Sequence, residues 1–182
     1  MAVTFGSYCR STLLALALLS AVTGQVEAKR AFARGPNGSV GAFNSQGQYG
    51  SRMGARVLGQ NAGAGFRHGQ FTGPNGGSLN GNGNFAYKRG AGGFRNSAWN
   101  GTAPKGASGS GYSHSQYNAQ TGQGARSSSE QLATSSGKDY GYTGDTSFTK
   151  GQGGSSVVQT DNHGTYDVNF AKGQKPVVAP VP

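Results

Sequence analysis

The residue pattern with the clearest chemical meaning in this chain is a basic side chain next to an aromatic ring. It occurs at Phe66-Arg67, at Tyr87-Lys88-Arg89 and at Phe94-Arg95. A guanidinium group binds phosphate, carboxylate and sulfate, and a ring beside it can stack on a base or a sugar. The pattern therefore predicts contact with an anionic polymer.

Positive charge is concentrated in the first part of the chain. From Lys29 to Arg126 there are 11 Lys and Arg residues and no Asp or Glu, whereas residues 127–182 hold 4 basic and 5 acidic side chains, a net charge of −1. For an exported protein the available polyanions are acidic polysaccharide, lipopolysaccharide and extracellular DNA. Spread charge that only keeps the chain soluble fits equally well. The predicted polyanion-binding residues are Arg52, Arg56, Arg67, Lys88, Arg89 and Arg95.

Catalytic and metal-binding patterns find little support. His68, His114 and His163 lie far apart, without His or Cys partners at ligand spacing. The five carboxylates after residue 28 all lie in the last third of the chain, and no G-x-S-x-G elbow follows a strand. The sequence therefore predicts a protein that is not an enzyme and that uses no cofactor and no metal.

The first 28 residues have the pattern of a secretory signal peptide. Arg10 precedes an apolar run from Leu13 to Val22, and Val26-Glu27-Ala28 is a small-x-small cleavage ending. We expect cleavage after Ala28, which would also remove the single cysteine, Cys9. The mature chain is then predicted to lie in the periplasm, at the cell surface or outside the cell, with no disulfide and no membrane span.

The composition of the mature chain argues against an ordinary hydrophobic core. It contains 32 glycines and no isoleucine, and most of its large apolar side chains are its 16 aromatic residues. Burial of so few groups does not offset the conformational entropy of ordering about 150 residues. The expected fold class is mainly β or disordered, as a loose array of antiparallel β-hairpins in a glycine-rich chain.

The best hairpin signal lies at residues 155–171, where the turn sequence DNHG joins SSVVQT to TYDVNF. The second run alternates apolar and polar side chains strictly. Phe85 and Tyr87, and likewise Tyr140 and Tyr142, are also spaced to share one face of a strand. The predicted assembly hairpin consists of Val157, Val158, Tyr166, Val168 and Phe170.

The tetrapeptide GPNG occurs at 35–38 and again at 73–76. Proline followed by Asn-Gly favours a tight reversal, so the repeat predicts a recurring strand-turn-strand corner. An aromatic residue precedes a turn glycine by about five residues at Phe32, Phe71, Tyr117 and Phe148, at spacings of 31 to 46 residues. Such spacing indicates a loose array and not a strict solenoid.

The FTGPNGGS and YNAQTGQG segments behind a signal peptide resemble secreted bacterial glycine-rich repeat proteins in which TGPNG and Y-x-x-x-TG turns alternate. The resemblance covers about residues 30–155 and implies an extracytoplasmic, β-rich repeat protein. The QYGSRMGARVLGQ segment matches curlin-type repeats only weakly, because Met53 occupies the expected Asn position and Gln60 comes one residue late.

These observations divide the chain into a signal peptide at 1–28, a basic glycine-rich region at 29–126, a less basic hairpin region at 127–171 and a Pro-rich tail at 172–182. The favoured function is a secreted structural or adhesive protein of the cell surface or extracellular matrix that self-associates. The alternative is a soluble cationic antimicrobial or envelope-binding protein, similar in composition to insect attacin-like proteins.

Overall fold

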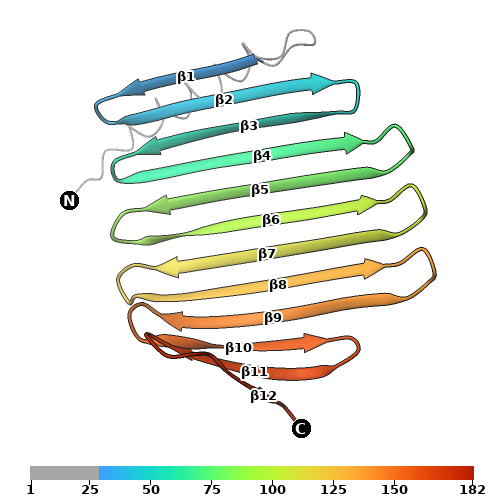
Figure 1. Cartoon of the computed structure of the whole chain (residues 1–182). Helices are drawn as coiled ribbons and strands as arrows, with labels where there is room; N and C mark the ends of the chain where they lie inside the picture. The colour runs from blue at the N-terminus through green and yellow to red at the C-terminus, as the bar shows by residue number, and fades with distance from the viewer. Residues whose placement is uncertain (1–28) are drawn as a thin grey trace.

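The computed structural model describes residues 29–182, which form twelve β-strands and no helix (Figure 1). The predicted signal peptide and Cys9 lie outside the described residues. The fold is the antiparallel array of hairpins that the sequence predicts. The strands are β1 (Lys29–Gly35), β2 (Gly38–Gly47), β3 (Gly50–Gly59), β4 (Ala62–Thr72), β5 (Ser78–Lys88), β6 (Gly92–Thr102), β7 (Ser108–Asn118), β8 (Gln123–Ala133), β9 (Asp139–Thr149), β10 (Gly153–Thr160), β11 (Gly164–Ala171) and β12 (Val177–Pro180).

All twelve strands belong to one open sheet, in which the order of strands across the sheet is their order in the chain. Every pair is antiparallel, and the register continues one to one without a bulge, as in β4 and β5, where Ala62 faces Lys88 and Thr72 faces Ser78. Six consecutive strands, β4 to β9, have 11 residues each. Side chains directly across from one another therefore form straight rows that cross many strands.

The true repeat of the chain becomes visible in the loops at one end of the sheet, on the right in Figure 1. Residues 73–77, 103–107 and 134–138 form five-residue loops of the same design. In each, the first amide donates to the last carbonyl, at 2.6 to 2.8 Å. Each also has a glycine of positive φ at its fourth position, namely Gly76, Gly106 and Gly137. These loops begin at Gly73, Ala103 and Thr134, so the repeat is two strands long, or 30 to 31 residues.

The two GPNG segments form corners, as expected, but they are not equivalent. Pro36 and Asn37 make a two-residue turn between β1 and β2, whereas residues 73–76 belong to a five-residue loop at the opposite end of the sheet (Figure 1). The turns after Tyr117 and Phe148 lie at the same end as Pro36. The spacing found in the sequence was irregular because the compared segments belong to loops at both ends of the sheet.

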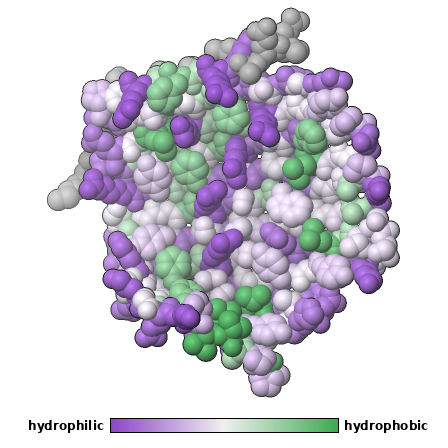
Figure 2. All heavy atoms as spheres, in the orientation of Figure 1, coloured by the Kyte–Doolittle hydropathy of each residue, from purple (hydrophilic) through white to green (hydrophobic). Residues whose placement is uncertain are grey.

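The sheet is a single layer. Apart from one marginal contact, each strand packs only against its neighbours in the sheet. Among the described residues Ala42 is the one buried hydrophobic side chain, with 4% of its surface exposed. The face in Figure 2 accordingly mixes hydrophilic and hydrophobic side chains over its whole area. Continuous backbone ladders, and not a hydrophobic core, hold the strands together.

The C-terminal part of the sheet contains the predicted hairpin and a further strand. β10 and β11 pair from Gly153 with Ala171 to Thr160 with Gly164, which confirms the hairpin expected at 155–171. The Pro-rich tail provides β12, which pairs with β11. The change in charge after Arg126 falls inside β8, so the sheet continues across it.

Candidate polyanion-binding face

The register assigns each strand residue to one of two faces. Residues directly across an antiparallel pair project to the same side, and successive residues in a strand project to opposite sides. We call one side the arginine face and the other the polar face. The arginine face is defined by the row Phe32, Gly41, Arg56, Gly65, Phe85, Arg95, Ser115, Arg126, Thr146, Ser156, Val168 and Val178.

Arginine is confined to one side of the strands. Residues 29–182 contain 8 arginines, of which 7 lie on the arginine face and the eighth, Arg89, lies in the turn between β5 and β6. The polar face has no arginine in any described strand. The arginines of the arginine face are Arg30, Arg34, Arg52, Arg56, Arg67, Arg95 and Arg126.

Aromatic rings share this preference. Of the 16 aromatic residues in the described chain, 12 lie on the arginine face, 3 lie on the polar face, and Tyr49 lies in a turn. The 12 are Phe32, Phe43, Phe71, Phe85, Tyr87, Trp99, Tyr117, Tyr140, Tyr142, Phe148, Tyr166 and Phe170. Phe85 and Tyr87 share a face, as do Tyr140 and Tyr142, in agreement with the sequence prediction.

Glycines provide the space in which these rings lie. A Cβ atom at Gly65 would be 2.8 Å from Cε1 of Phe85, and one at Gly54 would be 2.7 Å from Cε1 of Phe43. Each ring thus leans over a glycine on the neighbouring strand and covers its backbone. Cross-strand pairs of glycine with an aromatic residue recover the packing that glycine alone lacks.

One row shows this arrangement in its most regular form. From β4 to β11 it reads Gly63, Tyr87, Gly93, Tyr117, Gly124, Phe148, Gly154 and Phe170. The rings of Tyr117 and Phe148 are nearly parallel, with centroids 6.3 Å apart. Strands lie about 4.8 Å apart and every second strand supplies a ring, so the strands that carry neighbouring rings are about 9.6 Å apart. The side chains of Tyr117 and Phe148 lean toward each other and bring their rings closer than their strands. A row of this kind is a stacking surface for the planar or apolar faces of a polymer's units.

The arginines lie beside these rings and have no acidic row partners. Arg56 faces Gly41 and Gly65, and Arg67 faces two further glycines, while Arg126 Nε donates to Ser113 Oγ at 3.2 Å. None of the five arginines from β3 to β8 has a carboxylate as a row partner. Their charges therefore remain available to an external anion.

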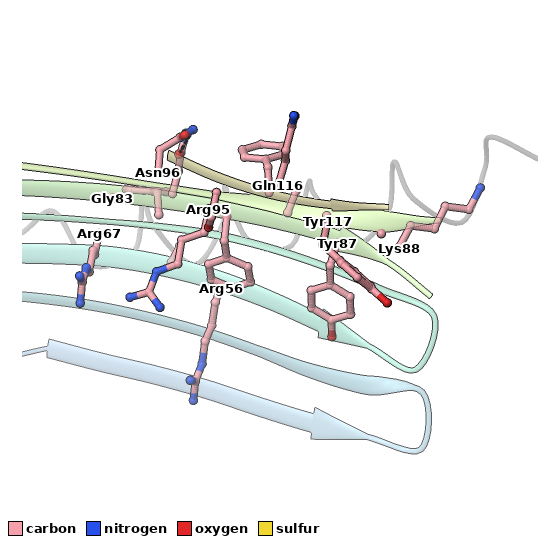
Figure 3. A pocket seen from close by; sticks show the side chains of 18 of the residues that line it. Arg56, Arg67, Gly83, Tyr87, Lys88, Arg95, Asn96, Gln116 and Tyr117 are labelled. Carbon is pink, nitrogen blue, oxygen red and sulfur yellow. Dashed lines mark hydrogen bonds between the residues drawn. The ribbon is translucent and has the colours of Figure 1, made fainter. Parts of the chain in front are cut away.

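Four residues of the arginine face, Arg30, Arg56, Arg67 and Arg95, border an open depression of about 1310 Å³, and Arg89 from the turn between β5 and β6 lines it as well. Figure 3 shows Arg56, Arg67 and Arg95 on the same side of the sheet as Tyr87, with Asn96 projecting from the other side. Aromatic side chains of the arginine face that also line the depression are Phe32, Phe43, Phe85, Tyr117 and Phe148. The depression thus combines cationic groups with rings.

The polar face has a different chemistry, because its side chains bond to one another. Asn80 Nδ2 donates to Asn100 Oδ1 at 3.1 Å, and Asn96 Nδ2 donates to Asn84 Oδ1 at 2.8 Å. His114 Nδ1 is hydrogen-bonded to the same Asn96. Amide ladders of this kind stabilise a sheet and use up the side-chain groups that form them.

Four of the six predicted polyanion-binding residues lie together on the arginine face: Arg52, Arg56, Arg67 and Arg95. Lys88 lies on the polar face at the end of β5, and Arg89 lies in the following turn. The sequence missed Arg30, Arg34 and Arg126, which also lie on the arginine face. An adjacent aromatic residue is not what distinguishes them, because Arg52 and Arg56 have none either.

The rings adjacent in sequence to Arg67 and Arg95 do not lie on the same face as these arginines. Phe66 and Phe94 precede Arg67 and Arg95 in the chain, but neighbours in a strand project to opposite faces, so both rings lie on the polar face. Rings on the side of the arginines come from adjacent strands, as Phe85 does for Arg95. The alternation of residues within each strand is the signal that reveals this.

The predicted assembly hairpin is also divided between the faces. Val158, Tyr166, Val168 and Phe170 lie on the arginine face, and Val157 lies on the polar face. β11 is paired on both sides, with β10 and with β12. The hairpin is therefore not at the margin of the sheet.

No protein-family model matches the chain, and no curated protein or solved structure is similar to it at a significant level. Within residues 29–182 no cluster of three or more His, Cys, Asp or Glu residues is placed to hold a metal ion. The described residues also contain no helix that is long and apolar enough to span a membrane.

Proposed function

We propose that this protein is a secreted adhesive protein of the cell surface or extracellular matrix, and that its arginine face binds an anionic polymer. The observation that carries the proposal is the placement of 7 of 8 arginines on the face that also holds 12 of 16 aromatic rings. Arginine placed only for solubility would have no reason to avoid the polar face, on which the strand lysines Lys29 and Lys88 lie.

The distribution of the arginines favours a polymer over a small anion. They extend from β1 to β8, which is seven strand spacings or about 34 Å. A single phosphate or carboxylate would contact one or two of these side chains, whereas an extended chain of anionic units contacts several at once. Multiple weak contacts along one molecule raise the overall affinity.

The aromatic rings supply contacts that do not depend on charge. Rings that lie over glycines hold their positions on the sheet before a ligand arrives, and they offer apolar surface next to the guanidinium groups. Sugar rings and bases both stack on such surfaces. A single-layer sheet suits this task, because no other described strand packs over its face and a long ligand can reach it.

The proposal is tested by removing charge from one face only. The exported protein carrying Arg56→Gln, Arg67→Gln and Arg95→Gln is compared with one carrying Lys105→Gln, Lys138→Gln and Lys150→Gln, which loses the same net charge from the loops. Binding to polygalacturonate and to DNA is measured across a salt series. We expect the arginine variant to lose at least about tenfold in affinity and to flatten the salt dependence.

The lysine variant is expected to change affinity by less than about threefold. Equal losses in the two variants would mean that net charge alone governs binding, and the proposal would then fail.

A second candidate function is a soluble cationic protein that acts on bacterial envelopes. Its support is the same combination of rings and arginines, which also suits an anionic lipid surface. Dye release from lipid vesicles distinguishes the two functions. A protein that disrupts envelopes releases dye from phosphatidylglycerol vesicles, whereas an adhesive polymer binder leaves them sealed.

A further inference from the structure

The two outermost strands of the sheet differ in what their free backbone edges offer. In the described sheet β1 pairs only with β2, and β12 pairs only with β11. β1 contains no proline, whereas the end of the chain contains Pro176, Pro180 and Pro182. An unpaired strand edge is a template for another strand. The prolines therefore bear directly on whether the sheet can grow by adding a second copy of the chain.

The hydrogen bonds fix which residues of β12 point away from the sheet. The amide of Val181 donates to the carbonyl of Thr165 at 2.8 Å, so Val181 points its backbone groups toward β11. Backbone direction alternates along an antiparallel strand. Positions 176, 178, 180 and 182 consequently point outward, and three of these four residues are proline. Val178 alone keeps an outward amide donor.

Proline at these positions blocks the approach of a further strand. Each one removes an N–H that a neighbouring strand would need, and its ring occupies the place of the missing hydrogen. The same residue facing β11 would instead have broken the native ladder. The spacing of the three prolines thus protects the outer edge of β12 while its inner edge stays paired.

Without the prolines, β12 of one copy would match β1 of the next. The sheet has twelve strands, an even number, so β12 and β1 run in opposite directions and a copy displaced along the sheet would continue the antiparallel order. Two β1 edges would repel each other, because β1 carries Lys29, Arg30 and Arg34.

We propose that β12 is a proline cap over an otherwise matched head-to-tail joint between copies, and that it prevents the sheet from growing at its C-terminal edge. The cap directs the predicted self-association away from this edge and leaves the arginine face exposed on a sheet of limited size. A joint of this type is heterologous, so its release would produce open filaments and not closed dimers.

The test compares two double variants of the exported protein. Pro176→Thr with Pro180→Thr restores two outward donors, and Pro74→Thr with Pro104→Thr removes two prolines from loops as the matched control. Sedimentation velocity, thioflavin fluorescence and electron microscopy are followed against protein concentration. We expect the uncapped variant to form filaments at about a tenfold lower concentration than the native protein or the loop control.

A second change identifies the partner strand. Adding Arg30→Pro and Arg34→Pro to the uncapped variant should abolish its filaments, because proline removes backbone donors from β1 that the β12 of the next copy would need. An uncapped variant that stays monomeric, or a native protein that forms filaments equally well, would overturn the proposal. Filaments that survive the β1 changes would overturn the head-to-tail joint.

Discussion

The two faces of the sheet hold the same strands together by different side-chain contacts. On the polar face, amides and hydroxyls bond across strands, as Asn80 does with Asn100 and Ser78 Oγ with Thr102 Oγ1 at 2.9 Å. On the arginine face, rings cover glycines and the guanidinium groups between them lack acidic row partners. The polar face is therefore occupied by its own contacts, and the arginine face retains capacity for a ligand.

This difference shows how a sheet without a core can still have a defined structure. Within residues 29–182 no second layer packs on either face, so each face must be stabilised by contacts between neighbouring strands. Hydrogen-bonded ladders and rings on glycines are two such solutions, each contributing a few tenths to about 1 kcal/mol per pair. Summed over twelve strands, these contacts replace the burial that the composition does not provide.

The largest expected effect comes from filling a glycine site on the arginine face. A Cβ at Gly93 would lie 2.5 Å from the carbonyl oxygen of Ala86 and 2.8 Å from Cβ of Tyr87, so Gly93→Ala should cost about 1 to 3 kcal/mol of stability. The nearest atom to a Cβ at Gly81, the carbonyl oxygen of Ala98, is 3.9 Å away. Gly81→Ala should therefore be neutral or stabilising by up to about 1 kcal/mol. Urea unfolding followed by circular dichroism measures both, and equal losses would contradict the role of close packing.

A smaller effect is expected from two tyrosines on opposite faces of β7. Tyr117 stacks on Phe148 on the arginine face, whereas Tyr112 lies on the polar face with 53% of its surface exposed. Tyr117→Ala should lower stability by about 1 kcal/mol and also weaken polyanion binding, because it removes a ring from the stacking row. Tyr112→Ala should leave binding unchanged. Titration with polygalacturonate and DNA measures both variants. If Tyr112→Ala weakened binding more than Tyr117→Ala, the rings of the polar face would be the ones that bind the polymer.

The sequence predicted the class of fold and several local features correctly. The hairpin at 155–171 could be predicted because its turn residues and the alternation of apolar and polar side chains in its strands indicate the same structure. Phe85 and Tyr87 were placed on one face because a spacing of two residues suffices for that within a strand. These inferences need only local information.

The composition of the two faces required the register between strands, which local patterns do not contain. Register depends on the length of each loop. The five-residue loops are only slightly longer than the turns at the other end of the sheet, and in a glycine-rich sequence the two lengths cannot be told apart. A usable signal did exist. In β7 the glycines at 109 and 111 alternate with serines at 108 and 110, which marks one face of that strand as the side where rings from neighbours lie.

The smallest expected effect tests the polar face. Asn80→Ala removes the hydrogen bond from Asn80 Nδ2 to Asn100 Oδ1, which lies in a solvent-exposed place, with Asn100 exposed and Asn80 half-buried. Water replaces the lost partner, so the cost should be only about 0.2 to 1 kcal/mol of stability. Binding to either polyanion should not change, because Asn80 projects away from the arginines. Unfolding and polyanion titrations of this variant together separate the two faces. A clear loss of binding with little loss of stability would place the ligand on the polar face, and the division of labour between the faces would then be wrong.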